Sequence, residues 1–416
     1  MTSIVKQRIE QIRCGEVPEG YKKTKAGVIP SEWELRPLSK HLTESRIPGT
    51  NGAIAKKLTV KLWNKGVFEK REVHEGSEST TYYKRKSGQL IYSKLDFLNC
   101  AFGIIPDHLN DYESTQDLPC FDISNVDPYY LLTYVTQRNF YTHFGMIADG
   151  GRKARRVGPE DMLSFPLIYP SLPEQEKITE ILSAQDKLIA LKEKLIEKKK
   201  LQKKALMQQL LTGKKRLPGF SREWKKQKMS DILCERKEEN QSQSLRICSV
   251  AVNNGVVDQR EHLGKSMAAS DTSNYNVVHY GDIVYTKSPT GAFPYGIVKQ
   301  SQLTENVAVS PLYGVYEPTS YEIGYLLNEY FMYPNNANGY LLPIINKGAK
   351  NTINISNSMF ITPSLYLPTD FEEIKKLAQI FKAANKEIEI LQKELYQEKQ
   401  KKKAFMQLLL TGIVRI

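Results

Sequence analysis

The chain has 416 residues, of which 40% are hydrophobic and 25% charged, and this is the composition of an ordinary globular protein. No stretch approaches the ~20 apolar residues of a membrane-spanning helix, and the charged start, Met1 to Arg13, leaves no room for the apolar core of a secretory signal. The net charge of +13 favours a polyanion or an acidic protein as partner, and the five scattered cysteines without a Cys-x-x-Cys pair favour a reduced, cytoplasmic compartment.

The first globular segment extends from Trp33 to Leu172 and mixes short β-rich runs with turns. Residues 89–93 and 101–105 are predicted to be strands, because they are rich in β-branched and aromatic residues, and residues 129–140 are predicted to be helical. Together with the N-terminal segment, residues 1–172 are therefore predicted to form an α+β domain of normal size.

A long central helix is predicted over residues 173–213. Glu174 and Glu176 follow Pro173 in its first turn, where carboxylates favour the positive end of the helix dipole, and Gly213 is a natural stop. Apolar or small residues recur at spacings of three and four, which is typical of a coiled-coil seam. The seam residues are Ile181, Ala184, Leu188, Leu191 and Leu195.

A second globular segment, residues 214–367, has predicted strands at 282–286 and 295–298 and a predicted helix at 321–331. A second long helix is predicted over residues 368–416, with Gly412 as its natural stop. Its seam residues are Phe381, Ala384, Ile388, Leu391 and Leu395. We expect partner proteins to bind the two helices around Ile181, Leu188, Leu195, Ile388, Leu391 and Leu395. The alternative is two ordinary amphipathic helices, each packed on its own core.

The two halves of the chain are copies of one unit. Residues 203–213 read KKALMQQLLTG and residues 402–412 read KKAFMQLLLTG, a match too close for chance. Shorter matches pair Trp33 with Trp224, Gly88 with Gly281, and Pro173 with Pro368. Their slightly different separations indicate small loop insertions. We therefore predict two similar α/β domains, each followed by a long helix.

The length of the connecting segment predicts how the two helices pair. A helix from Pro173 to Gly213 is ~60 Å long at 1.5 Å per residue, whereas the chain from Gly213 to Trp224 reaches at most ~40 Å. The second domain therefore starts near the far end of the first helix. We predict an antiparallel pair, a rod with one domain at each end and approximate two-fold symmetry about its middle.

Two kinds of segment place basic residues at equivalent positions in both halves. Tyr92-Ser93-Lys94 corresponds to Tyr285-Thr286-Lys287. A glycine-flanked loop with Arg152, Lys153, Arg155 and Arg156 corresponds to a second one with Lys347, Lys350 and Asn351. Lysine and arginine neutralise phosphates, and arginine and asparagine read base edges in the major groove. We predict that these residues bind DNA; the alternative is that they are solvated surface loops.

Motifs of catalysis and metal binding are missing from the sequence. Gly264-Lys265-Ser266 resembles the end of a phosphate-binding loop, but the glycine required five positions earlier is Gln259. The six histidines form no His-Glu-x-x-His pair, and no Gly-x-Ser-x-Gly elbow or Asn-Pro-Pro-aromatic segment occurs. We assign no catalytic residue and no metal ligand, and the sequence favours a recognition subunit over an enzyme.

In combination, these features resemble the specificity subunits of Type I restriction–modification enzymes. The resemblance rests on Ile29-Pro30-Ser31-Glu32-Trp33, on the run LPEQEKI at residues 172–178, and on the Leu-Leu-Thr-Gly ending of both helices. It covers nearly the whole chain. The second copy departs from the pattern, because Pro368-Thr369-Asp370-Phe371 replaces the Pro-Glu-Gln-Glu form, and this leaves the predicted helix intact.

The resemblance implies two target recognition domains, each reading one half of a bipartite site in double-stranded DNA, and antiparallel helices that set the unread spacer. It implies that two adenine-N6 methyltransferase subunits bind the helices, and that restriction subunits with translocase and nuclease activity join them. S-adenosylmethionine, ATP and Mg²⁺ would then belong to the partners. Half-sites one turn apart, ~34–36 Å, put both readers on one face of DNA.

Two alternatives remain open. One is the specificity subunit of a related system in which methylation and cleavage are fused on one partner. The other is a coiled-coil adaptor that does not bind DNA, against which the charge of +13 and the basic loops in both halves argue.

Overall fold

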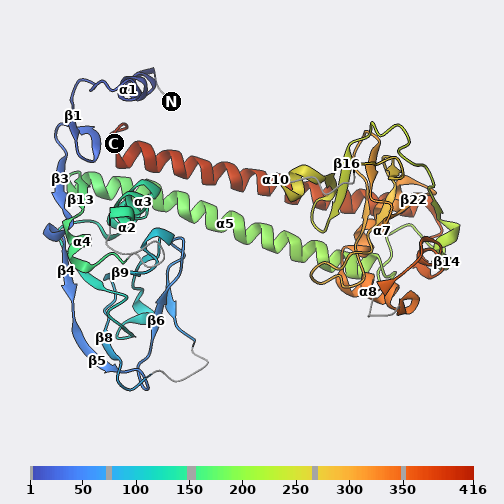
Figure 1. The fold of residues 1–416 in the computed structure, drawn as a ribbon, viewed down its shortest axis with the longest axis horizontal. Coiled ribbons are helices and arrows are strands. Elements are labelled where there is room, and N and C mark those ends of the chain that lie inside the picture. Colours follow the sequence, from blue (N-terminus) through green and yellow to red (C-terminus); the bar gives the residue numbers. More distant parts are fainter. Residues whose placement is uncertain (1–2, 72–76, 148–155, 265–269, 348–352) are drawn as a thin grey trace. The chain divides into compact units, whose positions relative to one another are not determined.

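The computed structural model describes residues 3–71, 77–147, 156–264, 270–347 and 353–416 (Figure 1). The chain divides into unit 1, Met1–Lys192 with Glu394–Ile416, and unit 2, Glu193–Lys393. Two long helices, α5 (Leu172–Leu210) and α10 (Phe371–Leu410), each contribute to both units. This division differs from the four consecutive segments expected from the sequence, whose boundaries stay a prediction.

Unit 1 is built from antiparallel strands with helices packed on them. Its main sheet has the order β10 (Phe102–Ile104), β9 (Leu90–Tyr92), β12 (Cys120–Ile123), β4 (Leu42–Ser45). A second sheet has the order β11 (Glu113–Ser114), β8 (Thr81–Lys84), β5 (Ile47–Asn51). The remaining pairs are β1 (Tyr21–Thr24) with β2 (Gly27–Pro30), β3 (Glu34–Pro37) with β13 (Pro166–Tyr169), and β6 (Leu58–Val60) with β7 (Val67–Glu69). Its shorter helices are α1 (Ser3–Arg13), α2 (Pro128–Val135), α3 (Arg138–Ile147) and α4 (Pro159–Ser164).

Unit 2 repeats the main sheet and adds a different second one. The main sheet has the order β20 (Val298–Gln300), β19 (Ile283–Tyr285), β22 (Gly314–Pro318), β15 (Leu233–Glu235). The second has the order β17 (Gly255–Asp258), β16 (Ile247–Ala251), β21 (Val307–Val309), β18 (Asn276–Val278), in which β16 and β21 are parallel. The remaining pairs are β14 (Lys225–Lys228) with β25 (Ser364–Leu367), and β23 (Asn346–Lys347) with β24 (Ile353–Asn354). Its shorter helices are α6 (Gln259–Leu263), α7 (Tyr321–Phe331), α8 (Pro334–Leu341) and α9 (Asn357–Phe360).

The two units therefore share a frame and differ at the periphery. The four-strand order is the same in both main sheets, and the pair β3–β13 in unit 1 corresponds to the pair β14–β25 in unit 2. The second sheet has three antiparallel strands in unit 1 and four strands, two of them parallel, in unit 2. The predicted α+β fold with two similar domains is confirmed.

Each frame is joined to a long helix through a buried tryptophan. In unit 1, Trp33 Nε1 donates to Glu174 Oε2 at 2.9 Å, and Arg415 Nη2 donates to the same oxygen at 3.1 Å. Both helix ends turn through a left-handed glycine, at φ +69° for Gly213 and +71° for Gly412. At Gly412 a side chain would collide with the ring of Pro30, so only glycine fits there.

Unit 2 has the same three-residue cluster. Trp224 Nε1 donates to Glu373 Oε2 at 3.1 Å, and Arg216 donates to both oxygens of Glu373 at 2.9 and 2.8 Å. The arginine of unit 1 follows α10 in the chain, whereas the arginine of unit 2 follows α5. The core of each unit is thus completed by a helix end that comes from the other half of the sequence.

Within each unit the parts of α5 and α10 run antiparallel. In unit 1, Asp186 pairs with Lys402 and Lys192 with Glu394, both at 2.6 Å. In unit 2, Lys199 pairs with Glu387 at 2.6 Å, and Arg216, just beyond α5, pairs with Glu373 in the first turn of α10. Residues later in α5 therefore pair with residues earlier in α10, as in antiparallel helices. The rod with a domain at each end stays a prediction.

The seam predicted on the first helix is wrong by one position. Leu188, Leu191 and Leu195 are 37%, 63% and 40% exposed. The positions one residue later are the covered ones: Leu182 and Ile196 are 0% and 4% exposed, Gln185 Nε2 donates to Glu398 Oε2 at 2.7 Å, and Lys192 forms the ion pair with Glu394. Leu188, Leu191 and Leu195 therefore form an exposed stripe of α5. On α10 the predicted residues Ile388, Leu391 and Leu395 are half-buried.

Candidate nucleic-acid interface

The main sheet of unit 1 presents the first candidate segment at the end of β9. The Tyr92 side chain is fully buried, and its hydroxyl donates to the carbonyl oxygens of Val157 at 3.0 Å and Gly158 at 2.9 Å. Burial raises the pKa of Tyr92 above its ordinary value. Ser93 is also buried, and its Oγ donates to Asp96 Oδ2 at 3.1 Å. These two side chains are part of the core, so the prediction that they contact DNA is wrong for both.

Lys94 and Arg156 are brought together beside Asp117. The backbone N of Lys94 donates to the Asp117 carbonyl at 3.0 Å, and Arg156 Nη1 lies 3.9 Å from Asp117 Oδ1. The backbone N of Val157 donates to the Lys94 carbonyl at 3.3 Å. The end of the basic loop is therefore fixed next to Lys94. The other predicted residues of this loop, Arg152, Lys153 and Arg155, lie outside the described residues.

Unit 2 has the same arrangement at the end of β19. Tyr285 is buried, its hydroxyl donates to the Tyr295 carbonyl at 2.8 Å, and its ring stacks on Phe360 at 4.7 Å. Burial raises the pKa of Tyr285. Thr286 is buried as well, and its backbone N donates to the Ile297 carbonyl at 2.9 Å. The prediction that the side chains of Tyr285 and Thr286 contact DNA is therefore wrong.

Lys287 reaches the surface of unit 2. It is half-buried, and desolvation lowers its pKa while the negative charge of Glu235 opposes this shift. Glu235 Oε1 also accepts a hydrogen bond from Asn357 Nδ2 at 2.8 Å, at the start of α9. Asn357 closely follows the second basic loop. Of that loop, Lys350 and Asn351 lie outside the described residues, and Lys347 is placed only by its backbone, which pairs with Ile353.

The two units are alike at the ends of the equivalent strands β9 and β19. In both, a buried tyrosine ends a strand of the main sheet and a lysine follows two residues later, but the nearby acidic residue comes from different elements, Asp117 before β12 in unit 1 and Glu235 on β15 in unit 2. That acidic residue also contacts the segment that follows the basic loop, through Arg156 or Asn357. In unit 1 the two segments predicted to bind DNA therefore meet beside Asp117, whereas in unit 2 Lys287 lies near Glu235 and Asn357, and Lys350 and Asn351 of the predicted loop lie outside the described residues.

A second basic turn was not singled out from the sequence. In the loop between β6 and β7, Trp63 is 57% exposed and, like Asn64, has a left-handed backbone, with φ of +60° and +51°. Hydrogen bonds of 2.8 Å from their backbone N atoms to the carbonyls of Asn99 and Cys100 hold this costly conformation. The exposed residues Lys61 and Lys65 lie on either side of Trp63 in the chain. The sequence signal that could have identified this turn is a tryptophan between two lysines, followed by a glycine.

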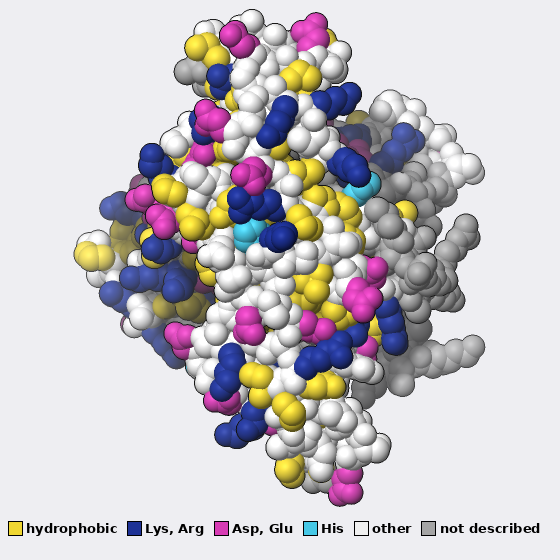
Figure 2. All heavy atoms as spheres, turned by 90° about the vertical axis from the view of Figure 1, so that its left-hand side faces the viewer, with side chains coloured by type: hydrophobic (Ala, Val, Ile, Leu, Met, Phe, Trp, Pro, Cys, Tyr) yellow, Lys and Arg dark blue, Asp and Glu magenta, His cyan; other side chains and the backbone are white. Residues whose placement is uncertain are grey.

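The excess positive charge is not gathered in a single patch on the face drawn in Figure 2. Lysine and arginine side chains are spread over this face, with aspartate and glutamate side chains between them.

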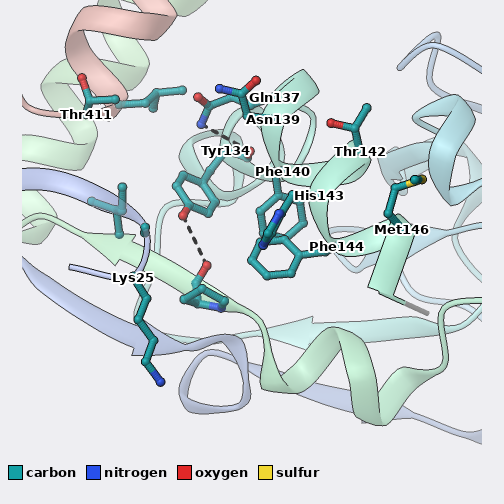
Figure 3. A pocket seen from close by; sticks show the side chains of 14 residues that line it. Lys25, Tyr134, Gln137, Asn139, Phe140, Thr142, His143, Phe144, Met146 and Thr411 are labelled. Carbon is teal, nitrogen blue, oxygen red and sulfur yellow. Dashed lines mark hydrogen bonds between the residues drawn. The ribbon is translucent and has the colours of Figure 1, made fainter. Parts of the chain in front are cut away.

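A cavity of about 730 Å³ lies in unit 1 between α3, β13 and the end of α10 (Figure 3). Tyr134 donates to the Pro166 carbonyl at 3.2 Å, and the rings of Phe140 and Phe144 lie 4.9 Å apart. The wall also contains His143, but no aspartate or glutamate among the described residues that line it. The cavity therefore lacks the carboxylate that would pair with His143 in acid–base catalysis.

The described part of the chain shows no group of three or more His, Cys, Asp or Glu residues that could hold a metal ion. Burial raises the pKa of the Cys100 and Cys120 thiols to about 12 and that of Cys248 to about 11. These thiols are protonated and unreactive at neutral pH. None of the described helices is both long and apolar enough to cross a membrane.

No family model matches the chain. Among solved structures, the chain is similar to one from a type I R-M system described for its complex assembly and conformational transition, with a TM-score of 0.54 and 12% identity over 93% of this chain and 99% of that one. It is also similar to the S subunit of a type I restriction-modification system from M. genitalium, with a TM-score of 0.52 and 11% identity over 91% and 96%. The HsdS subunit from Thermoanaerobacter tengcongensis has a TM-score of 0.48 and 13% identity over 93% and 98%. The fold assignment rests on the first two, and it confirms the fold that the sequence resemblance implied.

Proposed function

We propose that this chain is the DNA sequence-specificity subunit of a Type I restriction–modification complex, in which each unit reads one half of a bipartite site. One observation carries the proposal: both units have the same main-sheet frame, in which a lysine follows the buried tyrosine that ends the equivalent strand, while the second sheets differ. A shared frame with different peripheral surfaces is what two readers of different half-sites require.

The exposed stripe of α5 supports the proposed docking of two adenine-N6 methyltransferase subunits, with restriction and translocase subunits joining them. Unit 1 contributes Leu188 and Leu191, and unit 2 contributes Leu195. Exposed leucines at this density on a helix are costly in water and favour a protein partner. On α10, Ile390 and Tyr396 are exposed as well. Ile181 packs against the core of unit 1 and is a poorer candidate for docking.

The chain is proposed to be non-catalytic, with S-adenosylmethionine, ATP and Mg²⁺ acting in the partner subunits. The similarity in fold to the S subunit of a type I restriction-modification system supports this. The setting of the spacer by the helices and a cytoplasmic location are proposed with it.

Methylation mapping tests the proposal directly. The chain is co-expressed with its partner methyltransferase, and methylated adenines are mapped over the host genome. We expect a split, asymmetric motif with a fixed spacer. A single continuous motif would contradict a two-reader subunit. A complex that binds all duplexes with equal affinity would favour the coiled-coil adaptor.

Exchange of one domain tests the division of labour. Residues 218–367 are replaced by the equivalent domain of another specificity subunit. Because the two units carry separate surfaces, one half of the motif is expected to change and the other to stay the same. A change in both halves would show that the units do not read DNA independently.

A further inference from the structure

Unit 2 contains a polar cavity of about 580 Å³ between α7, α10, the end of α5 and the strand β20. Its volume is in the range of small-molecule sites. The charged residues that line it are Lys203, Lys299, Glu329, Lys382, Lys386 and Glu389. The proposed DNA function makes no use of this cavity.

The ion pairs in the cavity involve only two of its four lysines. Lys203 Nζ lies 2.6 Å from Glu329 Oε2, and Lys386 Nζ lies 3.1 Å from Glu389 Oε2. These four charges cancel. Among the described residues, Lys299 and Lys382 have no carboxylate within ion-pair distance, so the cavity carries two uncompensated positive charges.

Lys299 is the more unusual of the two. It lies on β20, is only 3% exposed, and its Nζ contacts the Met332 Sδ. An ammonium group has three donors, and a thioether is a weak acceptor. Burial therefore lowers the pKa of Lys299 to about 8, although the charge of Glu329 opposes the shift. A buried ammonium without an oxygen acceptor is costly unless a ligand supplies one.

Lys382 and the tyrosines limit what the ligand is. Lys382 Nζ lies 4.1 Å from the ring centre of Tyr321, and the Tyr321 ring also stacks on Tyr280 at 5.0 Å. This ring is already in contact with a cation and another ring, so it is not free to stack on a base. Asn253 and Asn254, on the exposed turn between β16 and β17, add amide groups to the wall. The cavity thus offers positive charge and hydrogen-bond donors.

We propose that this cavity binds a phosphate group, with Lys299 and Lys382 as its main contacts. A phosphate supplies several oxygen acceptors and a charge that offsets both lysines. The group belongs either to a free small molecule or to the DNA backbone, and the chemistry of recognition is the same for both. The proposal does not require that the chain reads a DNA sequence, since a free phosphate compound would serve equally as the ligand.

The test uses the full chain and measures its melting temperature and its binding by calorimetry, in a chloride buffer, with added inorganic phosphate, AMP, or a short duplex without a target site. Lys299→Met removes the charge and keeps an unbranched side chain of similar length. Lys382→Gln removes the second charge. Lys375→Gln, an exposed position of α10 that does not line the cavity, is the matched control.

We expect phosphate or AMP to raise the melting temperature of the native chain and of Lys375→Gln, and Lys299→Met to weaken this binding about tenfold or more. Because Lys299→Met removes a buried charge, it is expected to fold at least as well without ligand. If only the duplex binds, and Lys299→Met weakens it, the phosphate comes from DNA. Absence of binding by all three ligands, or equal weakening by Lys299→Met and Lys375→Gln, would overturn the proposal.

Discussion

The arginine after α10 provides a sharp test of how unit 1 is held together. In Arg415→Ala the Glu174 carboxylate, whose side chain is 8% exposed, loses its cationic partner and keeps only the Trp33 indole as donor. Breaking a buried ion pair costs about 3–5 kcal/mol. The Arg415 side chain is 37% exposed, so solvent screens part of this interaction. We expect a loss of about 1–3 kcal/mol in the free energy of unfolding.

Urea unfolding measures the loss, and hydrogen exchange locates it. Exchange is expected to accelerate in β3 and β13 of unit 1, with little change in unit 2. Arg222→Ala is the control, because this arginine is 73% exposed and lies 3.9 Å from its partner Asp370. It should cost less than about 0.5 kcal/mol. An equal stability change in Arg415→Ala and in the control would refute the role assigned to the cluster.

Three further predictions follow from other parts of the molecule. In Lys94→Ala, the slope of log affinity for DNA against log salt concentration should fall in magnitude by about 0.9, the value for one lost phosphate contact. Lys375→Ala is the control and should leave the slope unchanged. An unchanged slope in Lys94→Ala would show that Lys94 does not contact DNA. Leu191→Lys should leave the free energy of unfolding within about 0.5 kcal/mol of the native value, because the side chain is exposed, yet abolish co-purification of the methyltransferase. Full retention of the methyltransferase would exclude this stripe as the docking surface. The pKa of Lys299 is lowered from 10.5 to about 8, so between pH 8 and 10.5 the unfolded chain binds more protons than the folded chain. The free energy of unfolding of the native protein should therefore rise with pH over this range by on the order of 3 kcal/mol relative to that of Lys299→Met. Parallel curves of stability against pH for the two proteins would contradict the buried ammonium.

The duplication was visible in the sequence because the same packing constrains both helix ends. Gly412 is confined by Pro30 and Trp33, and Gly213 lies against Trp224, so the residues around them have few alternatives. The fold class and the correspondence between the two halves of the sequence could therefore be predicted. The order of the strands within each sheet could not, because it depends on contacts between residues far apart in the chain.

The seam of α5 shows why apolar periodicity failed at that point. Leu188, Leu191 and Leu195 recur at coiled-coil spacing, but they form the exposed stripe. The covered side, one residue further along, mixes the apolar residues Leu182 and Ile196 with Gln185 and Lys192, whose ends meet carboxylates on the other helix. Periodicity identifies which residues are apolar, and it does not reveal which side of the helix is covered.

The two tyrosines were misassigned for a different reason. Tyr92 and Tyr285 each lie two residues before a lysine, so from the sequence they resemble an amphipathic surface segment. Their hydroxyl groups are bound by backbone carbonyls of residues 157, 158 and 295, and this satisfies the polar end inside the core. Only a structure reveals such partners.

The exchange of helix ends between the halves determines when each unit can be completed during synthesis. Unit 2 is one continuous stretch, Glu193–Lys393, whereas unit 1 needs its last stretch, Glu394–Ile416, to fill the core with Leu409 and Leu410 and to supply Arg415. On the ribosome, domains generally fold from the N-terminus onward. Here the order is reversed at the final step: the first unit to be translated is the last to close, and an interrupted chain leaves its apolar core open.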